Sequence, residues 1–431
     1  MKKIILIIIS LIFFIPKVFA VTLSEALTIA YNNNPELNAE RENIKVSEED
    51  LNISKGEYHP TLTLSGSKSK EDTNKLTNQS GGDAAVTDVD PQTTSITIEQ
   101  TLFDAGRSAE HEKNKIGIEL AIAKLIKKEQ DILYKAIEAY SGLILANEKF
   151  EINKTNVNLL ERQVETDSIR FERGQVTLAD VAQSESSLAE AQAKFIQAQN
   201  EVLTSKLNYE NIIGPLTSSN LLDKNSTLNF IMPADLNSAI KLSKKNNPDL
   251  IIAKLEYEQS KKDTVMAKSD LSPTAILSFE RSYNEDLSAT YDEREKDVLK
   301  ATLSWPFYSG GKNRAIHKKN KSLQSRTRLL LDNTIKTNET NVASAWSNFQ
   351  SNKSLLNSVE LQVKAAEIAN EGITAEYESG LGRTTLEVIQ SNSFLLNAQI
   401  SLANSQRNFL LSQFNLLKTV GLLNSDYLNI K

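Results

Sequence analysis

The sequence predicts a mainly helical fold with a few amphipathic strands, built as a duplicated helix–β-hairpin–long helix–helix unit. Three observations predict it. Glycine (15 of 431 residues) and proline (9) are scarce among many helix-forming residues, which favours long helices. Four short segments alternate apolar and polar residues, a period typical of strands. The same order of segments occurs in both halves of the chain, which indicates an internal repeat.

The start of the chain has the features of a secretory signal peptide. Two lysines precede an apolar run at 4–15, and Val18-Phe19-Ala20 is a suitable cleavage site. The alternative is a single membrane anchor, but a run of 12 residues is too short to span a bilayer of about 30 Å as a helix. We therefore predict a signal peptide at 1–20.

Charge and cysteine content exclude several classes of protein. Loss of Lys2, Lys3 and Lys17 with the signal peptide changes the net charge from −6 to −9, which argues against nucleic acid as a partner. The chain contains no cysteine, so disulfides, thiolate metal sites, a cysteine nucleophile and a lipidated N-terminal cysteine are excluded.

Aligned segments define the repeat. Both halves contain Asn-Asn-Pro followed by a helical pattern, then an aromatic–glycine segment, then a matching Gln-Ser pair. The aligned pairs are 33–64 with 246–277 (offset 213), 100–107 with 305–312 (offset 205) and 180–192 with 387–399 (offset 207). We predict repeats at 21–214 and 235–421, a linker at 215–234 and a C-terminal tail at 422–431.

Each predicted repeat opens with one helix of about 35 residues, at 22–57 and at 235–270. Pro60 and Pro273 end these helices. A hairpin of two amphipathic strands follows, joined by a polar loop at 68–93 or 284–297. The predicted strands are 61–67 and 94–102 in the first repeat, and 274–283 and 298–305 in the second.

A pair of long helices completes each repeat, at 105–214 and at 312–421. The descending helix of about 68 residues would span on the order of 100 Å. In the returning helices apolar residues recur every seven positions in two adjacent rows, for example Val181, Leu188 and Phe195 beside Ala182 and Ala189. This repeat predicts coiled-coil packing, and two rows allow contacts with more than one neighbour. A simple helical hairpin within one chain is the alternative.

Four strands with one apolar face are too few to close a sheet. An open sheet of this kind exposes both edges in water, whereas in lipid only a closed barrel satisfies the backbone. Transmembrane barrels need at least about 8 strands, so several chains must combine theirs. We therefore predict an oligomeric barrel in contact with outer-membrane lipid. The alternative is a small soluble sheet covered by helices.

The layout resembles the TolC family of outer-membrane efflux proteins over essentially the whole mature chain. The shared features are the duplicated plan, "NNNPEL" and "KNNPDL" after the opening helix, "LFDAGR" and "PFYSGGK" after the second strand, and "ESGLGRTTLEVIQ" before the last helix. The resemblance implies a homotrimer whose 12-stranded outer-membrane barrel continues into a long periplasmic α-helical barrel. It also implies a conduit for drug efflux or type I protein secretion, a periplasmic adaptor, and an inner-membrane pump that is ABC-type or proton-driven.

Two turns join the long helices, and the resemblance directs attention to them. Thr177 and Thr384 each precede an acid by three residues, which predicts capping boxes at the starts of the returning helices. The turn glycine is Gly174 in the first copy and Gly380 or Gly382 in the second, because the second copy contains an extra residue. In the family such turns contact the adaptor.

The resemblance also implies roles for side chains near these turns. Glu387 and Gln390 match the family's acidic constriction ring, and Asp180 is the corresponding acid of the first copy. Tyr377 and Arg383 match residues that link neighbouring coiled coils to the position of Asp180 and hold the aperture closed. The plain alternatives are helix caps for the acids and a solvated charge for Arg383.

The sequence offers little support for the hypothesis that the protein is an enzyme. The three histidines show no metal-ligand spacing, and no phosphate-binding or nucleophile motif occurs, so we expect neither a metal nor a cofactor. The main alternative to a channel is a soluble periplasmic coiled-coil protein, such as an adaptor with a helical hairpin, and a second alternative is a filament or surface-layer subunit. An adaptor would carry one hairpin between β-rich domains, instead of two hairpins and four amphipathic strands.

Overall fold

The computed structural model describes residues 20–72, 80–82, 89–216, 222–224, 228, 230–288, 291–380 and 382–430. Residues 1–19 of the predicted signal peptide, parts of the predicted linker and of both predicted strand loops, and Leu381 lie outside this range. Among the described residues, no helix has both the length and the hydropathy needed to cross a bilayer.

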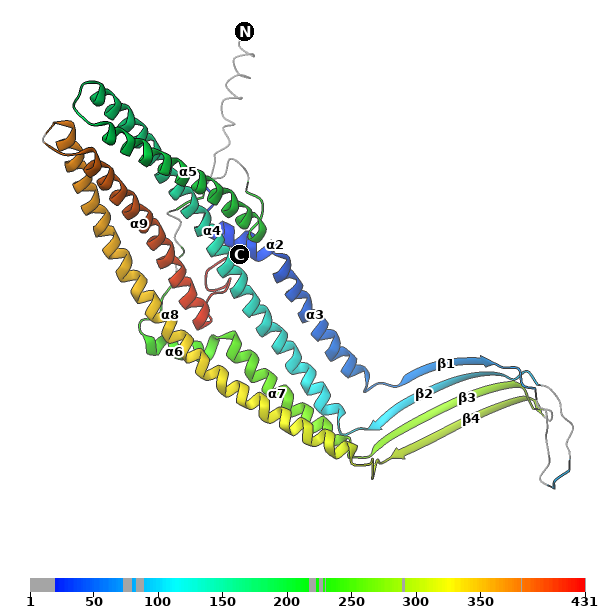
Figure 1. The fold of residues 1–431 in the computed structure, drawn as a ribbon. Helices are drawn as coiled ribbons and strands as arrows, with labels where there is room; N and C mark the ends of the chain where they lie inside the picture. Colours follow the sequence, from blue (N-terminus) through cyan, green and yellow to red (C-terminus); the bar gives the residue numbers. More distant parts are fainter. Residues whose placement is uncertain are drawn as a thin grey trace, which may run out of the picture. The chain divides into compact units, whose positions relative to one another are not determined.

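The chain divides into two compact units. The sheet unit consists of Glu42–Ala123 and Ile251–Asn333, and the hairpin unit of the described residues in Met1–Arg41, Lys124–Leu250 and Thr334–Lys431. The elements are α2 (Leu23–Asn33), α3 (Pro35–Gly56), β1 (Thr61–Lys68), β2 (Gln92–Phe103), α4 (Arg107–Glu172), α5 (Leu178–Ile212), α6 (Leu236–Asn246), α7 (Pro248–Ser269), β3 (Thr274–Ser288), β4 (Tyr291–Ser304), α8 (Lys312–Glu378) and α9 (Thr385–Val420) (Figure 1).

The sheet unit carries one antiparallel sheet in the order β1-β2-β3-β4 (Figure 1). Its register aligns apolar residues across all four strands, because Leu62 pairs with Ile98, Ile98 with Phe279, and Phe279 with Leu299. These side chains lie on one face, and Leu62 and Leu299 are 72% and 71% exposed. Within one chain, the described residues therefore leave an apolar face of the sheet and the outer edges of β1 and β4 without a partner.

The β3–β4 hairpin is longer than the sequence predicts. The prediction of a loop at 284–297 was wrong for most of its length, since β3 continues to Ser288 and β4 begins at Tyr291. Ion pairs across the strands, from Arg281 to Glu295 and to Asp297, accompany this extension. Charged residues in this segment interrupt the apolar–polar alternation by which a strand is predicted from sequence. Backbone pairing does not depend on that alternation, so the strand forms nonetheless.

The opening helix of each repeat is two helices, so the prediction of continuous helices at 22–57 and 235–270 was wrong. Asn34 and Asn247 both adopt extended backbone, with ψ of 122° and 120°. The proline that follows each asparagine disfavours helical geometry at the preceding residue and is well suited to the first position of the next helix. The side chain of Asn34 accepts hydrogen bonds from the backbone N–H groups of Glu36 and Leu37, and Asn247 caps α7 in the same way.

The two helical hairpins are α4–α5 and α8–α9 (Figure 1). The parts of α4 after residue 123 and of α8 after residue 333 belong to the hairpin unit, together with all of α5 and α9. Apolar residues pack inside each pair. Leu160 of α4 packs with Ala191 of α5, and Ala366 of α8 packs with Ala398 of α9. Ile389 of α9 joins the first of these clusters, so the hairpins also contact each other within the chain.

The largest core lies where α2, α4, α5 and α9 meet the C-terminal tail. Leu27, Leu133 and Phe414 are fully buried there, together with Leu423 of the tail. The backbone N–H of Ser425 donates to the carboxylate of Glu129, with 2.5 Å between nitrogen and oxygen. The tail is thus part of the core of this unit and not a free extension.

Candidate functional site: the turns of the helical hairpins

The turns at 173–177 and 379–384 require glycine. Gly174 has a φ of 66°, and Gly380 and Gly382 have φ of 74° and 84°, values that side chains with a Cβ seldom adopt. The second turn therefore uses both of the glycines that the sequence left as alternatives. A Cβ at any of the three would meet open space, so backbone conformation and not crowding selects glycine here.

A capping box begins each returning helix. The hydroxyl oxygen of Thr177 accepts from the backbone N–H of Asp180, and the Asp180 carboxylate accepts from the N–H of Thr177 at 2.8 Å. Thr384 and Glu387 repeat this arrangement at the start of α9, also at 2.8 Å from Thr384 N to Glu387 Oε2. Hydrogen bonds to the backbone N–H of the capping threonine lower the pKa of both carboxyl groups.

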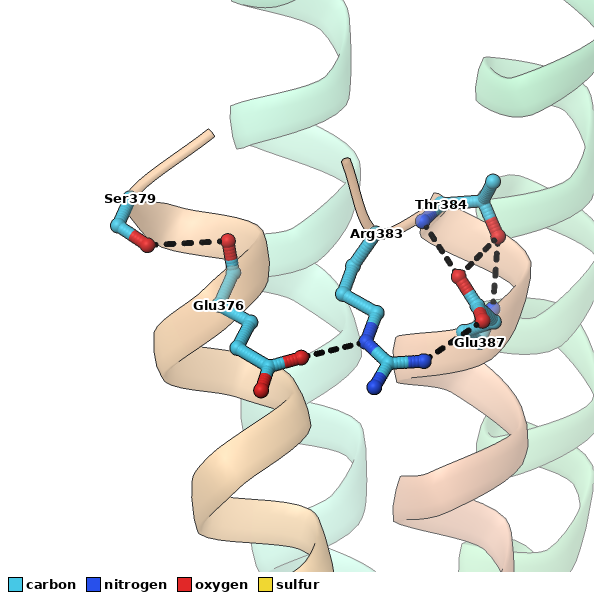
Figure 2. A network of polar contacts seen from close by, with 5 residues as sticks. All are labelled: Glu376, Ser379, Arg383, Thr384 and Glu387. Atoms are coloured by element: carbon cyan, nitrogen blue, oxygen red, sulfur yellow. Dashed lines mark hydrogen bonds and ion pairs between the residues drawn. The ribbon is translucent and has the colours of Figure 1, made fainter. Parts of the chain in front are cut away.

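Arg383 connects the two helices that flank the second turn (Figure 2). Its Nε lies 2.6 Å from a carboxylate oxygen of Glu376 in α8, and its Nη1 lies 3.0 Å from Glu387 Oε1 in α9. The three side chains are between 38% and 45% exposed. The contact is therefore an ion-pair bridge at the surface of the turn, in reach of solvent.

A buried polar cluster lies beneath the same turn. Asp167 of α4 is fully buried (0% exposed), and the hydroxyl of Tyr377 donates to its Oδ1 at 2.7 Å. Tyr377 also lies 3.0 Å from the hydroxyl of Thr385, and Gln163 Nε2 donates to Asp167 at 3.0 Å. Burial raises the pKa of the Tyr377 hydroxyl. The cluster joins the first hairpin to both helices of the second hairpin.

Sequence reasoning missed Asp167, although a signal was present. Residues 139, 146, 153, 160 and 167 are seven apart on α4 and all are buried. Three of them are apolar, but Asn153 and Asp167 are polar. A carboxylate in a heptad row needs hydrogen-bond donors from the neighbouring helices, and Tyr377 and Thr385 provide them.

The predicted side chains do not all meet in one chain. Among the described residues, Tyr377 and Arg383 form no hydrogen bond with Asp180 or with each other, and their hydrogen-bond partners are those named above. The guanidinium of Arg170 in α4 also lies over the ring of Tyr377, 4.2 Å from its centre. Asp180 bonds to Thr177, and Gln390 is exposed. In the described part of the chain no group of three or more His, Asp or Glu side chains could hold a metal ion.

Comparison with known proteins identifies the family to which this fold belongs. The family model described as outer membrane efflux protein matches residues 26–215 and again residues 239–422. The chain belongs to the outer membrane efflux protein family. As a member of this family, the protein is an exit duct of the outer membrane of Gram-negative bacteria.

Individual relatives are distant in sequence, but the similarity extends over most of their length. The outer membrane efflux protein BepC of Brucella suis is 24% identical over 95% of this chain and 87% of its own. The alkaline protease secretion protein AprF of Pseudomonas aeruginosa is 22% identical over 96% and 87%. The outer membrane protein TolC of Escherichia coli is 24% identical over 77% and 70%.

Solved structures share the fold. The outer membrane protein VceC of Vibrio cholerae superposes with a TM-score of 0.79 over 93% of this chain and 96% of its own, at 18% identity. The outer membrane channel CmeC of Campylobacter jejuni superposes with a TM-score of 0.79 over 93% and 85%, at 15% identity. These relatives are described as efflux, secretion and channel proteins and not as enzymes.

Proposed function

We propose that three copies of the chain form the duct, and that their sheets close into one 12-stranded barrel. The observation that carries this proposal is the four-stranded sheet with an apolar exposed face and two outer edges that pair with no other described strand. Three such sheets in a ring would pair β4 of each copy with β1 of the next and remove every edge. The apolar face would then meet lipid, and the polar face would line water.

Exposed apolar side chains on the hairpins support the same assembly. Ile196 and Leu203 of α5 continue one of the predicted coiled-coil rows, yet they are 65% and 56% exposed, and the nearby Leu207 is 57% exposed. In a trimer these rows would pack against the hairpin of the adjacent copy, and the hairpins of three copies would form one helical barrel.

We infer that the two halves of the chain arose by internal duplication, because they make matching contacts. The family model matches the chain twice. Asn34 Nδ2 donates to the backbone oxygen of Ile212, and Asn247 Nδ2 donates to that of Thr419. The offsets between these pairs, 213 and 207, are those of the sequence alignment. Each repeat thus supplies two strands and one hairpin to the proposed duct.

The hairpin turns would form the periplasmic mouth. In this proposal the turns with Gly174, Gly380 and Gly382 contact a periplasmic adaptor, and an inner-membrane pump delivers the cargo. Asp180, Glu387 and Gln390 line the aperture, while Arg383 and the cluster of Tyr377 with Asp167 hold the mouth narrow. The cargo is small molecules, secreted proteins or both, as the names efflux protein and protease secretion protein of the relatives suggest.

Cysteine cross-linking tests the trimer directly, because the native chain has no cysteine. One cysteine in β1, replacing Thr63, and one in β4, replacing Lys300, should give covalent dimers and trimers for at least one register of pairs along the two edges. Pairs in β1 and β3, which are not neighbours in the sheet, serve as the control. Fractionation to the outer membrane and a heat-modifiable trimer in unboiled gels are expected as well. A soluble monomer would refute the proposal and favour the coiled-coil adaptor alternative.

A further inference from the structure

The carboxylate of Glu387 has no free oxygen. Its Oε2 accepts from the backbone N–H of Thr384 at 2.8 Å and from the Thr384 hydroxyl at 3.1 Å. Its Oε1 accepts from Arg383 at 3.0 Å (Figure 2). The hydrogen bonds of Thr384 and Arg383 lower the pKa of Glu387, so this carboxyl group is ionised at neutral pH, but a cation lies against it.

The matching acid of the first turn is not covered in this way. Both hydrogen bonds of Thr177 reach Asp180 Oδ2, and the described residues provide no partner for Oδ1. At the offset of 207, the position of Arg383 corresponds to Val176, which carries no charge. The first turn also carries an arginine, Arg173, but it precedes the glycine, and the described contacts do not pair it with Asp180. The two turns thus share a capping box but differ in the arginine that pairs with the capping acid.

We propose that Arg383 screens Glu387 and thereby sets the ion preference of the periplasmic mouth. This inference rests on the proposed function, since it requires that the turns surround an aperture. Glu376, Arg383 and Glu387 together carry a net charge of −2 + 1 = −1. Without the arginine the same cluster carries −2. All three side chains are partly exposed, so a passing ion senses this charge through water.

The size of the effect follows from the unscreened charge. A unit charge about 7 Å from an ion in water changes the local concentration of that ion by roughly threefold. Arg383→Gln should therefore raise the ratio of potassium to chloride permeability by about that factor or more. A larger mouth alone would increase the conductance and reduce ionic selectivity, so the direction of the shift separates screening from a purely structural role.

Reversal potentials in planar bilayers under a potassium chloride gradient provide the test, with the full-length trimer in each case. Arg383→Gln should shift the potential toward stronger cation preference, and Arg383→Gln with Glu387→Gln should return it toward the native value. Arg162→Gln is the control: it removes an arginine 11 residues before the first turn, about 16 Å along α4, beyond the Debye length of about 10 Å at 0.1 M salt. The control should leave the potential unchanged.

A second variant keeps the inference testable if Arg383→Gln does not assemble. Glu376→Gln leaves Arg383 paired with Glu387 and makes the cluster neutral, so cation preference should fall. An Arg383→Gln channel with unchanged or weaker cation preference, or a Glu376→Gln channel with unchanged preference, would overturn the inference. Absence of any channel from the native protein would instead overturn the proposed function, and the two failures are therefore distinguishable.

Discussion

Replacing Tyr377 by phenylalanine tests the buried cluster beneath the second turn. The substitution removes the hydroxyl that donates to Asp167 at 2.7 Å, while the ring and its packing remain. Asp167 would keep Gln163 at 3.0 Å and the longer contact with Thr385 at 3.4 Å. Because Asp167 is fully buried, no water replaces the lost donor without a local rearrangement.

A hydrogen bond to a charged group contributes about 1.5–3 kcal/mol. Its loss should make local opening of the second turn roughly 10- to 150-fold more favourable. Amide hydrogen exchange at 160–172 and 374–390 should accelerate by that factor in the purified protein, whereas exchange at 334–350 should not change. Tyr134→Phe is the matched control, since the described residues offer its hydroxyl no hydrogen bond.

A double-mutant cycle with Asp167→Asn isolates the contact. If the hydroxyl and the carboxylate act together, Tyr377→Phe and Asp167→Asn should be strongly non-additive, with a coupling free energy of at least about 0.5 kcal/mol. Equal exchange rates in the native and Tyr377→Phe proteins, or additive effects of the two substitutions, would refute the claim that this cluster holds the second turn against the first hairpin.

The other predictions concern the turns and the core. Arg383→Ser combined with Tyr377→Phe should raise the single-channel conductance in planar bilayers, and an unchanged conductance would count against their role in narrowing the mouth. Thr177→Ala should cost about 1 kcal/mol of local stability at the start of α5, measured by hydrogen exchange beside Thr177→Ser, which keeps the cap. The pKa of Asp180 and of Glu387 is lowered in the folded protein. Both caps should therefore be intact at neutral pH and weaken as the pH falls below the ordinary pKa values of 3.8 and 4.5. If hydrogen exchange at the starts of α5 and α9, corrected for the intrinsic rate, did not change with acid pH, this expectation would be contradicted. Gly421→Ala should prevent stable folding, because its Cβ would lie 2.3 Å from the backbone oxygen of Asn246, whereas Gly174→Ala should cost only about 1–2 kcal/mol for its left-handed backbone; equal thermal stability of the two variants would contradict the difference.

Local rules made much of the fold predictable. Alternation located the strands near Leu62 and Ile98, and the heptad rows located the long hairpins. The spacing Thr-x-x-acid located both caps, because capping depends only on residues three positions apart. The same rules missed the break at Asn34, where the Asn-Pro sequence signals a helix end that the continuous amphipathic pattern obscures. They also missed the charged ends of β3 and β4, where cross-strand backbone pairing operates without an apolar alternation.

The residues near the hairpin turns show most clearly what the sequence determines and what tertiary packing decides. The sequence by itself predicted a repeated helix–hairpin–helix plan and four amphipathic strands, too few for one barrel, and it determined that the glycine turns are followed by capped helices. Only the tertiary structure decided the partners of the side chains near the turns. Tyr377 meets Asp167, which is 210 residues away in the chain, and Arg383 lies between Glu376 and Glu387. Caps and periods are set by neighbours in the sequence, whereas the partner of a buried hydroxyl is set by how separate helices pack.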